Sequence, residues 1–199
     1  TAASDLIIAD LNFGMYKDDI EVAKIIRAVI DQFKWPKSIT GSPGKSQPER
    51  VAEVVSIING SDHGILRFAA SMQSTDDEVL KLIKRKNLPL NRFDTLVTSP
   101  DHLSEFTEYF TELIIGLPGD TKEKHYQSLR DVVDGLGMNV VNVHQLALLK
   151  GAPLALPAQR QCYEFDERYR VLVGCIGSYA IGHSRVSCAE TEEIVVATN

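Results

Sequence analysis

The chain has 199 residues, 44% of them hydrophobic and 24% charged, as is ordinary for a globular protein. A chain of this length can bury a core without disulfide bonds. Its formal net charge of −6 argues against a nucleic-acid backbone or an anionic membrane surface as the main partner. No apolar run approaches the ~20 residues that span a bilayer, and the N-terminus has no targeting pattern. We therefore expect a cytoplasmic protein without nucleic-acid or membrane partners. Because the first residue is not Met, we also expect a chain cut from a longer one.

Three cysteines, Cys162, Cys175 and Cys188, follow one another at intervals of thirteen residues. An odd number of cysteines without a secretory signal fits a reducing compartment. The spacing matches no compact metal motif. We expect inert thiols and no metal site in this chain.

Strand-like and helix-like segments alternate along the first half of the chain. Strands are predicted at 6–10, 38–40 and 65–70, and helices at 18–33, 46–58 and 75–83. Each helix begins with a capping box, formed by Asp18 and Glu21, by Ser46 and Glu49, and by Thr75 and Glu78. The buried stripes are Val22, Ile26, Val29 and Phe33, then Val51, Val54, Val55 and Ile58, then Val79, Leu82 and Ile83.

The alternation continues to about residue 150. We predict a helix at 90–97, a strand at 110–115, a tight loop at 116–120, a helix at 121–136 that buries Leu129, Val132, Val133 and Leu136, and a strand at 139–146. Repeats of about thirty residues are typical of parallel βα units, which form a barrel or an open doubly wound sheet. The tail differs, with short strands predicted at 170–176, 185–188 and 193–198. We therefore expect an α/β domain over residues 1–155 and a small β extension over 156–199.

Polar residues follow the predicted strands, where ligands bind in parallel βα folds. They are Asp10, Asn12, Thr40, Lys45, Ser71, Gln73, Ser74, Glu112, Gly116, Asp120, His144 and Gln145. Structural roles stay open for several of them: Asp10 and Asn12 in a turn, Ser71 as a buried hydroxyl, and Glu112 with His144 as a pair across a barrel floor. The pattern suits a polar small molecule and contains few nucleophiles.

Four motifs, in this order, resemble the barrel of radical S-adenosylmethionine (SAM) enzymes, in the group that often carries a cobalamin-binding domain. They are Asp-Leu-Asn-Phe-Gly-Met at 10–15 followed by Asp18-Asp19-Ile20, Ser-Met-Gln-Ser at 71–74 with the helix that follows, Glu-Leu-Ile-Ile-Gly-Leu-Pro-Gly-Asp-Thr at 112–121, and Leu-Leu-Lys-Gly at 148–151. The resemblance covers roughly residues 6–154. It implies a partial βα barrel that begins at the family's second strand.

The resemblance also implies cofactors. In that family a Cys-x-x-x-Cys-x-x-Cys loop in the first βα unit holds a [4Fe–4S] cluster, which binds SAM and cleaves it to a 5′-deoxyadenosyl radical. No cysteine precedes Cys162, so this chain lacks the cluster loop. We expect SAM as the cofactor, with the cluster and a cobalamin belonging to the intact protein and neither ligated by this chain. Alone, the chain is expected to be inactive and to self-associate through the open barrel edge.

By resemblance, site roles transfer to ten positions, none of them catalytic. Asp10 and Asn12 match the motif that holds the SAM amino group. The resemblance puts Ser71 and Gln73 near the ribose and carboxylate of SAM, and Arg85 at the carboxylate. It puts Ile115, Gly116 and Leu117 along the adenine, and His144 and Gln145 near the adenine or the substrate.

The reaction implied is methyl or methylthio transfer. Two other functions stay open. An aldolase-like barrel enzyme needs a buried lysine at a strand end, and the nearest candidate, Lys45, lies in a polar loop. A non-catalytic binding or scaffold module would keep the barrel without the cluster. The sequence upstream of Thr1 separates these readings, because a three-cysteine motif there supports the enzyme.

Overall fold

A computed structural model describes residues 4–43, 47–61, 63–87, 95–96 and 106–198 of the chain. The α/β class predicted from the sequence is confirmed. The chain divides into two compact units, one made of Thr1–Gln73, Lys86–Leu113 and Ser128–Asn142, the other of Ser74–Arg85, Ile114–Gln127 and Val143–Asn199. The predicted boundary at residue 155 stays a prediction.

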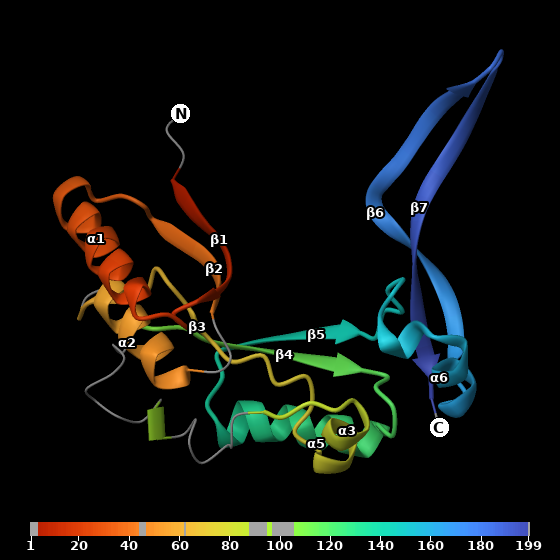
Figure 1. Cartoon of the computed structure of the whole chain (residues 1–199), viewed down its shortest axis with the longest axis horizontal. Coiled ribbons are helices and arrows are strands. Elements are labelled where there is room, and N and C mark those ends of the chain that lie inside the picture. Colours follow the sequence, from red (N-terminus) through yellow and green to blue (C-terminus); the bar gives the residue numbers. More distant parts are fainter. Residues whose placement is uncertain (1–3, 44–46, 62, 88–94, 97–105, 199) are drawn as a thin grey trace. The chain divides into compact units, whose positions relative to one another are not determined.

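Parallel strands form the frame of the first unit (Figure 1). They are β1 (Asp5–Phe13), β2 (Ser38–Pro43), β3 (Phe68–Ala69), β4 (Tyr109–Ile115) and β5 (Val140–Gln145). β1 pairs with β2 and β3 with β4, both parallel, and a parallel bridge between Ile39 and Leu66 links β2 to the segment before β3. β5 pairs with β4, and the Asn139 amide donates to the Tyr109 carbonyl at 3.0 Å where the two strands begin. Local pairing therefore links the five strands in sequence order.

Helices α1 (Asp18–Phe33) and α2 (Pro48–Asn59) pack on one face of these strands. The predicted stripe of α2 is confirmed, since Val51, Val54, Val55 and Ile58 are at most 2% exposed. The core of the unit also contains Ala23, Ile30, Ile39, Leu66, Phe68, Met72, Leu113, Val132, Leu136 and Met138. Each large aliphatic side chain buried here contributes about 1.5–3 kcal/mol.

Two predicted features of the first unit are wrong. The buried positions of α1 are Ala23 and Ile30, whereas Val22 is 43% and Phe33 64% exposed. Of the predicted stripe, Ile26 does pack against the core, and the error at the other positions arises because the apolar residues of α1 extend around more than one face. Asp18 does not cap α1, whose N-cap residue, Lys17, makes no side-chain capping bond. The Ser46 cap, Lys45 and most of the predicted helix at 90–97 lie outside the described residues.

Helices α3 (Asp77–Leu82) and α5 (Lys122–Arg130) belong wholly or largely to the second unit. Asp76, not Thr75, caps α3, because its carboxylate accepts a hydrogen bond from the Val79 amide at 2.9 Å. A π-helical turn, η1 (Asp131–Gly135), follows α5. Its wider turn rotates the side chains out of the predicted helical stripe, so Val132 is buried but Val133 is 46% exposed.

Strands β6 (Asp166–Ile181) and β7 (Ser184–Ala197) form an antiparallel hairpin, drawn as a long twisted ribbon in Figure 1. The segments predicted as strands at 170–176, 185–188 and 193–198 do lie in strands, but the last two belong to one strand, β7, and the strands are longer than predicted. Gly174 and Gly177 lie inside β6, Gly174 at an irregularity in the pairing, and only Gly182 lies in the connection. At the base of the hairpin, Arg160 of α6 (Pro157–Cys162) contacts Glu193 at 2.6 Å. A 3-10 turn, η2 (Pro153–Ala155), precedes α6. Among the described helices, none is long and apolar enough to cross a membrane.

Candidate functional site

A cavity of about 780 Å³ lies in the first unit, along the face of the strands that carries no helix. Alternation along β4 sets this arrangement, since Thr111 and Leu113 are fully buried toward the helices while Phe110 and Glu112 line the cavity. Its lining comprises Leu11, residues 37–42, residues 64–67, Ala69, Ser71, Glu108, Phe110 and Glu112. Polar groups from β2, from the segment after β3 and from β4 therefore face one partly open cavity.

Ser71 and Glu112 form the polar pair at the carboxyl end of these strands. The Ser71 hydroxyl donates to Glu112 Oε2 at 2.7 Å. Beyond Ser71, the amide of Gln73 donates to the Glu112 carbonyl at 2.7 Å. Gln73 has a φ of 65°, a left-handed conformation that costs energy for any residue with a Cβ and that often occurs at functional sites.

Asp10 and Asn12 lie near the end of β1, where the pairing with β2 is irregular. Asp10 Oδ1 accepts from the backbone amide of Asn12 at 2.8 Å, and both side chains are exposed, so their predicted role at SAM stays a prediction. Of this segment, Leu11 is the residue that lines the cavity. The turn beyond it is held by Asp19, whose Oδ2 accepts from the amides of Gly14 at 2.8 Å and Tyr16 at 2.9 Å.

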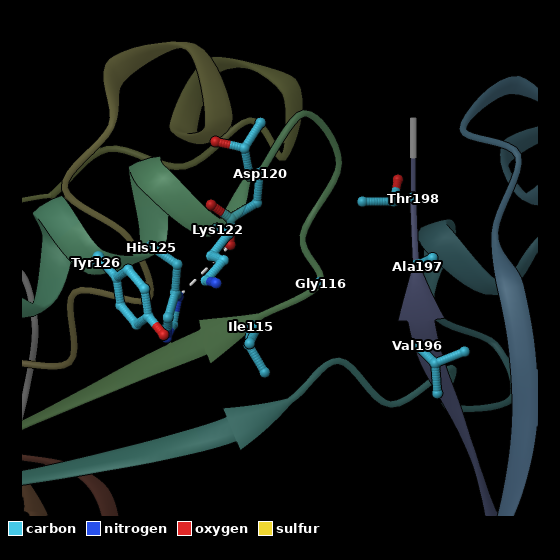
Figure 2. Close-up of a pocket in the computed structure, with 10 residues that line it drawn as sticks. Ile115, Gly116, Asp120, Lys122, His125, Tyr126, Val196, Ala197 and Thr198 are labelled. Atoms are coloured by element: carbon cyan, nitrogen blue, oxygen red, sulfur yellow. Dashed lines mark ion pairs between the residues drawn. The ribbon is translucent and has the colours of Figure 1, made fainter.

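Five predicted site residues at the ends of β4 and β5 lie in the second unit, away from the residues that line the first cavity. Ile115 and Gly116 line a second cavity of about 590 Å³, together with the start of α5 and the end of β7 (Figure 2). Leu117 is 2% exposed and packs in a second apolar core with Val79, Leu146, Leu148 and Val195. The side-chain amide of Gln145 (Nε2) donates to the Val195 carbonyl at 3.0 Å, and His144 is exposed on β5.

Arg85, which follows α3, is the sixth predicted site residue in the second unit. Its amide donates to the Leu80 carbonyl at 2.8 Å, which ends α3, and its side chain is half-buried. Of the ten predicted site residues, the structure therefore puts Ser71 on the first cavity and Ile115 and Gly116 on the second.

Sequence reasoning placed Glu112 among the polar residues at the strand ends but paired it with His144 across the barrel floor and gave it no role at SAM, whereas Glu112 accepts a hydrogen bond from Ser71. It also missed a buried pair beside the second cavity. Asp120 and His125 have side chains only 5% and 8% exposed, with 3.6 Å between Asp120 Oδ2 and His125 Nδ1. Burial raises the pKa of Asp120, although the nearby imidazole and the amides of Thr121 and Gly116 lower it.

Metal ligands do not gather in the part of the chain that the structure describes, where no group of three or more His, Cys, Asp or Glu side chains is arranged to hold an ion. Cys162, Cys175 and Cys188 are free thiols, exposed or half-buried. The residues described here therefore do not fit an iron–sulfur cluster.

Two curated proteins match most of the chain. A cobalamin-dependent radical SAM methyltransferase, TokK, from Streptomyces tokunonensis is 29% identical over 159 residues, which is 80% of this chain and 23% of that protein. A 2-(S-pantetheinyl)-carbapenam-3-carboxylate methyltransferase from Streptantibioticus cattleyicolor is 29% identical over 153 residues, 77% of this chain and 22% of that protein. These matches support assignment of the chain to the radical SAM family.

Further similarities are weaker. A tRNA-2-methylthio-N(6)-dimethylallyladenosine synthase from Mycobacteroides abscessus is 27% identical over 128 residues, 64% of this chain and 25% of that protein. The radical SAM enzyme coproporphyrinogen III oxidase (HemN) from Escherichia coli aligns with a TM-score of 0.41 and 14% identity over 78% of this chain and 45% of that structure. No family model matches. The chain spans about a quarter or less of the length of these curated relatives.

Proposed function

We propose that this chain is part of a radical SAM enzyme and supplies most of its SAM-binding barrel. The observation that carries the proposal is the match to a cobalamin-dependent radical SAM methyltransferase over 80% of the chain. Parallel pairing of the strands in sequence order agrees with it. The five strands then correspond to the second to sixth strands of a partial βα barrel, and the hairpin of β6 and β7 to a C-terminal extension.

SAM would bind at the carboxyl ends of β1, β3 and β4. Asp10 and Asn12 are proposed to hold its amino group, and Ser71 and Gln73 its ribose and carboxylate, with Arg85 as a second carboxylate ligand. The cavity beside Ser71 supports this, because Glu112 supplies acceptor oxygens and Ser71 a hydroxyl in a partly open cavity. We also propose that Ile115, Gly116 and Leu117 contact the adenine, and that His144 and Gln145 lie near the adenine or the substrate.

The [4Fe–4S] cluster is proposed to be held by another part of the intact protein, since the cysteines described here do not fit it. The same applies to cobalamin, for which no residue of this chain is assigned. When bound, SAM supplies the radical chemistry, and the role of these side chains is to bind and orient it. By itself the chain is proposed to be inactive.

Methyl or methylthio transfer is the proposed reaction class, because two relatives are named methyltransferases and the third a methylthio-adenosine synthase. A non-catalytic module with the same barrel is the second candidate. The aldolase-like alternative depends on Lys45, which lies outside the described residues. We further propose a cytoplasmic location and no nucleic-acid or membrane partner, in line with the net charge of −6.

The test uses the longer protein that contains this chain, purified anaerobically. Its sequence upstream of Thr1 is expected to encode Cys-x-x-x-Cys-x-x-Cys, and the non-catalytic module is favoured if it does not. In that protein, Asp10→Ala and Ser71→Ala should each weaken SAM binding by about tenfold, the factor for one lost hydrogen bond of roughly 1.4 kcal/mol. SAM affinity is measured by equilibrium dialysis.

Matched controls separate a lost ligand from a lost fold. Ser178→Ala and Asp77→Ala change exposed residues of β6 and α3, so SAM affinity should stay at the wild-type value. The visible absorption of the cluster should be the same in all four variants. Unchanged SAM affinity and SAM cleavage in both Asp10→Ala and Ser71→Ala would refute the site assignment.

A further inference from the structure

Asp120 is a buried acid whose carboxyl group is incompletely satisfied. Its side chain is 5% exposed, and Oδ1 has no hydrogen-bond partner. Oδ2 lies 3.6 Å from His125 Nδ1, too far for a hydrogen bond but close enough for strong attraction to a charged imidazole. A buried carboxylate without full pairing destabilises the structure around it.

The charged groups that pack around Asp120 do not neutralise it. Asp76, at the start of α3, raises the pKa of Asp120 by repulsion. On α5, Lys124 is engaged by Asp76 at 3.3 Å and Glu78 at 2.8 Å, while Lys122 lies 5.7 Å from the centre of the Tyr126 ring. The end of β7 beside the cavity, residues 196–198, carries no charge. His125 is therefore the remaining group that can balance the charge.

The segment that carries Asp120 is a tight turn between β4 and α5. Gly116 and Gly119 have φ of 86° and 72°, and the Asp120 amide donates to the Leu117 carbonyl at 3.0 Å. Figure 2 shows the turn and the start of α5 on one side of the cavity, with His125 below Asp120. Any contact between Asp120 and His125 consequently ties the turn to the first turns of α5.

We propose that Asp120 and His125 are a proton-controlled latch, which holds the turn at 116–120 against α5 when the pair carries an extra proton and releases it when that proton leaves. The cavity of about 590 Å³ is lined by both residues, so release changes the wall of that cavity. Asp120 and His125 are not among the residues proposed to bind SAM, although the turn that they hold contains Gly116 and Leu117, which are. The test of the latch measures the turn itself and needs no SAM.

The direction of the pH effect follows from Asp120. Burial raises the pKa of this carboxyl, so the folded state binds its proton more tightly than the unfolded chain does. The stabilisation is therefore present at low pH and is lost as pH rises from the unfolded-state pKa to the folded-state pKa. The imidazole of His125 opposes this effect in part, because its charge lowers the pKa of Asp120.

Amide hydrogen exchange in the whole chain tests the latch. After correction for intrinsic exchange, opening measured at the Asp120 amide should increase as pH rises above the ordinary carboxyl value of 3.8, by about tenfold for each unit by which the pKa in the closed state exceeds that in the open state. In Asp120→Asn, which has no charge to balance, this increase should be absent. In His125→Gln the increase should extend to higher pH, because the imidazole that lowers the pKa of Asp120 is gone.

The control is His183→Gln, which removes an exposed imidazole from the hairpin and should leave the pH dependence at Asp120 unchanged. The latch is refuted if opening at Asp120 does not change with pH in the wild type, or if the wild-type dependence persists in Asp120→Asn. Should Asp120→Asn fail to fold, the side-chain NMR titrations of the wild type decide. Coupled titration of Asp120 and His125 supports the latch, and independent titration overturns it.

Discussion

The side chain of Asn59 links the end of α2 to the segment before β3. It is fully buried at the end of α2, where Nδ2 donates to the Leu66 carbonyl at 2.9 Å and to Thr107 Oγ1 at 3.1 Å. Its Oδ1 accepts from the Leu66 amide at 3.0 Å. One side chain thus satisfies both backbone groups of Leu66, next to the bridge that joins β2 to the β3 segment.

Replacing Asn59 by Ala should lower the free energy of unfolding by about 2–4 kcal/mol, because it removes the partner of buried backbone groups. Chemical denaturation measures the loss. Asn142→Ala, at an exposed position of β5, should stay within about 0.5 kcal/mol of the wild type. Equal effects of the two substitutions would contradict this role of Asn59.

At the residue scale, the sequence predicted which positions are polar but not what they contact. Ser71 was expected as a ligand or as a satisfied hydroxyl, and it donates to Glu112 beside a cavity. Asp120 looked like part of a glycine turn, because local sequence does not reveal that His125 lies within 3.6 Å. Such pairs depend on how the turn packs against α5, and periodicity contains no information about that packing.

At the scale of elements, the bounds of α1 were predicted correctly, but the buried face was predictable for α2 and not for α1. Apolar residues of α2 fall on one helical face, so one burial pattern satisfies them. In α1 the apolar residues include Ile25 and Phe33, which are 65% and 64% exposed. Periodicity alone therefore allowed two different faces of α1 to be the buried one. The π turn after α5 was unpredictable because the sequence over residues 131–135 is compatible with an ordinary helix.

Strand β1 has a free edge among the described residues, since its one pairing partner there is β2. It also exposes Ile7 by 74% and Leu11 by 77%. Unpaired strand edges with apolar side chains recruit other strands. We therefore predict that the isolated chain self-associates through β1, as sedimentation velocity over a range of concentrations would detect.

A lysine on the edge strand should weaken that association, because a charge opposes edge-to-edge pairing. Ile7→Lys is thus expected to shift the chain toward monomer. Val173→Lys, at a fully exposed position of β6, is the matched control and should not. A monodisperse wild-type monomer at high concentration would contradict the prediction, and dissociation by Val173→Lys alone would assign the contact to the hairpin.

At the scale of the whole molecule, alternation of strands and helices was enough to predict an α/β fold with parallel strands. It was not enough to predict the hairpin of β6 and β7. Glycines at 174, 177 and 182 are ordinary strand breakers, yet only the last lies in the connection between the two strands. Tyr179 covers Gly177, with its hydroxyl 3.1 Å from where a Cβ would lie, which compensates for the missing side chain.

The last prediction concerns iron–sulfur binding by the isolated chain. Cluster thiolates converge from a compact loop, whereas Cys162 lies on α6, Cys188 pairs in register with Gly177, and Cys175 lies in the irregular part of β6. Anaerobic reconstitution with iron and sulfide should therefore give no stoichiometric cluster absorption. A variant with all three cysteines changed to alanine should give the same spectrum as the wild type, because any residual iron is then bound non-specifically. A stoichiometric cluster that is lost in the cysteine-free variant would refute this prediction and would mean that the hairpin rearranges to bring its thiols together.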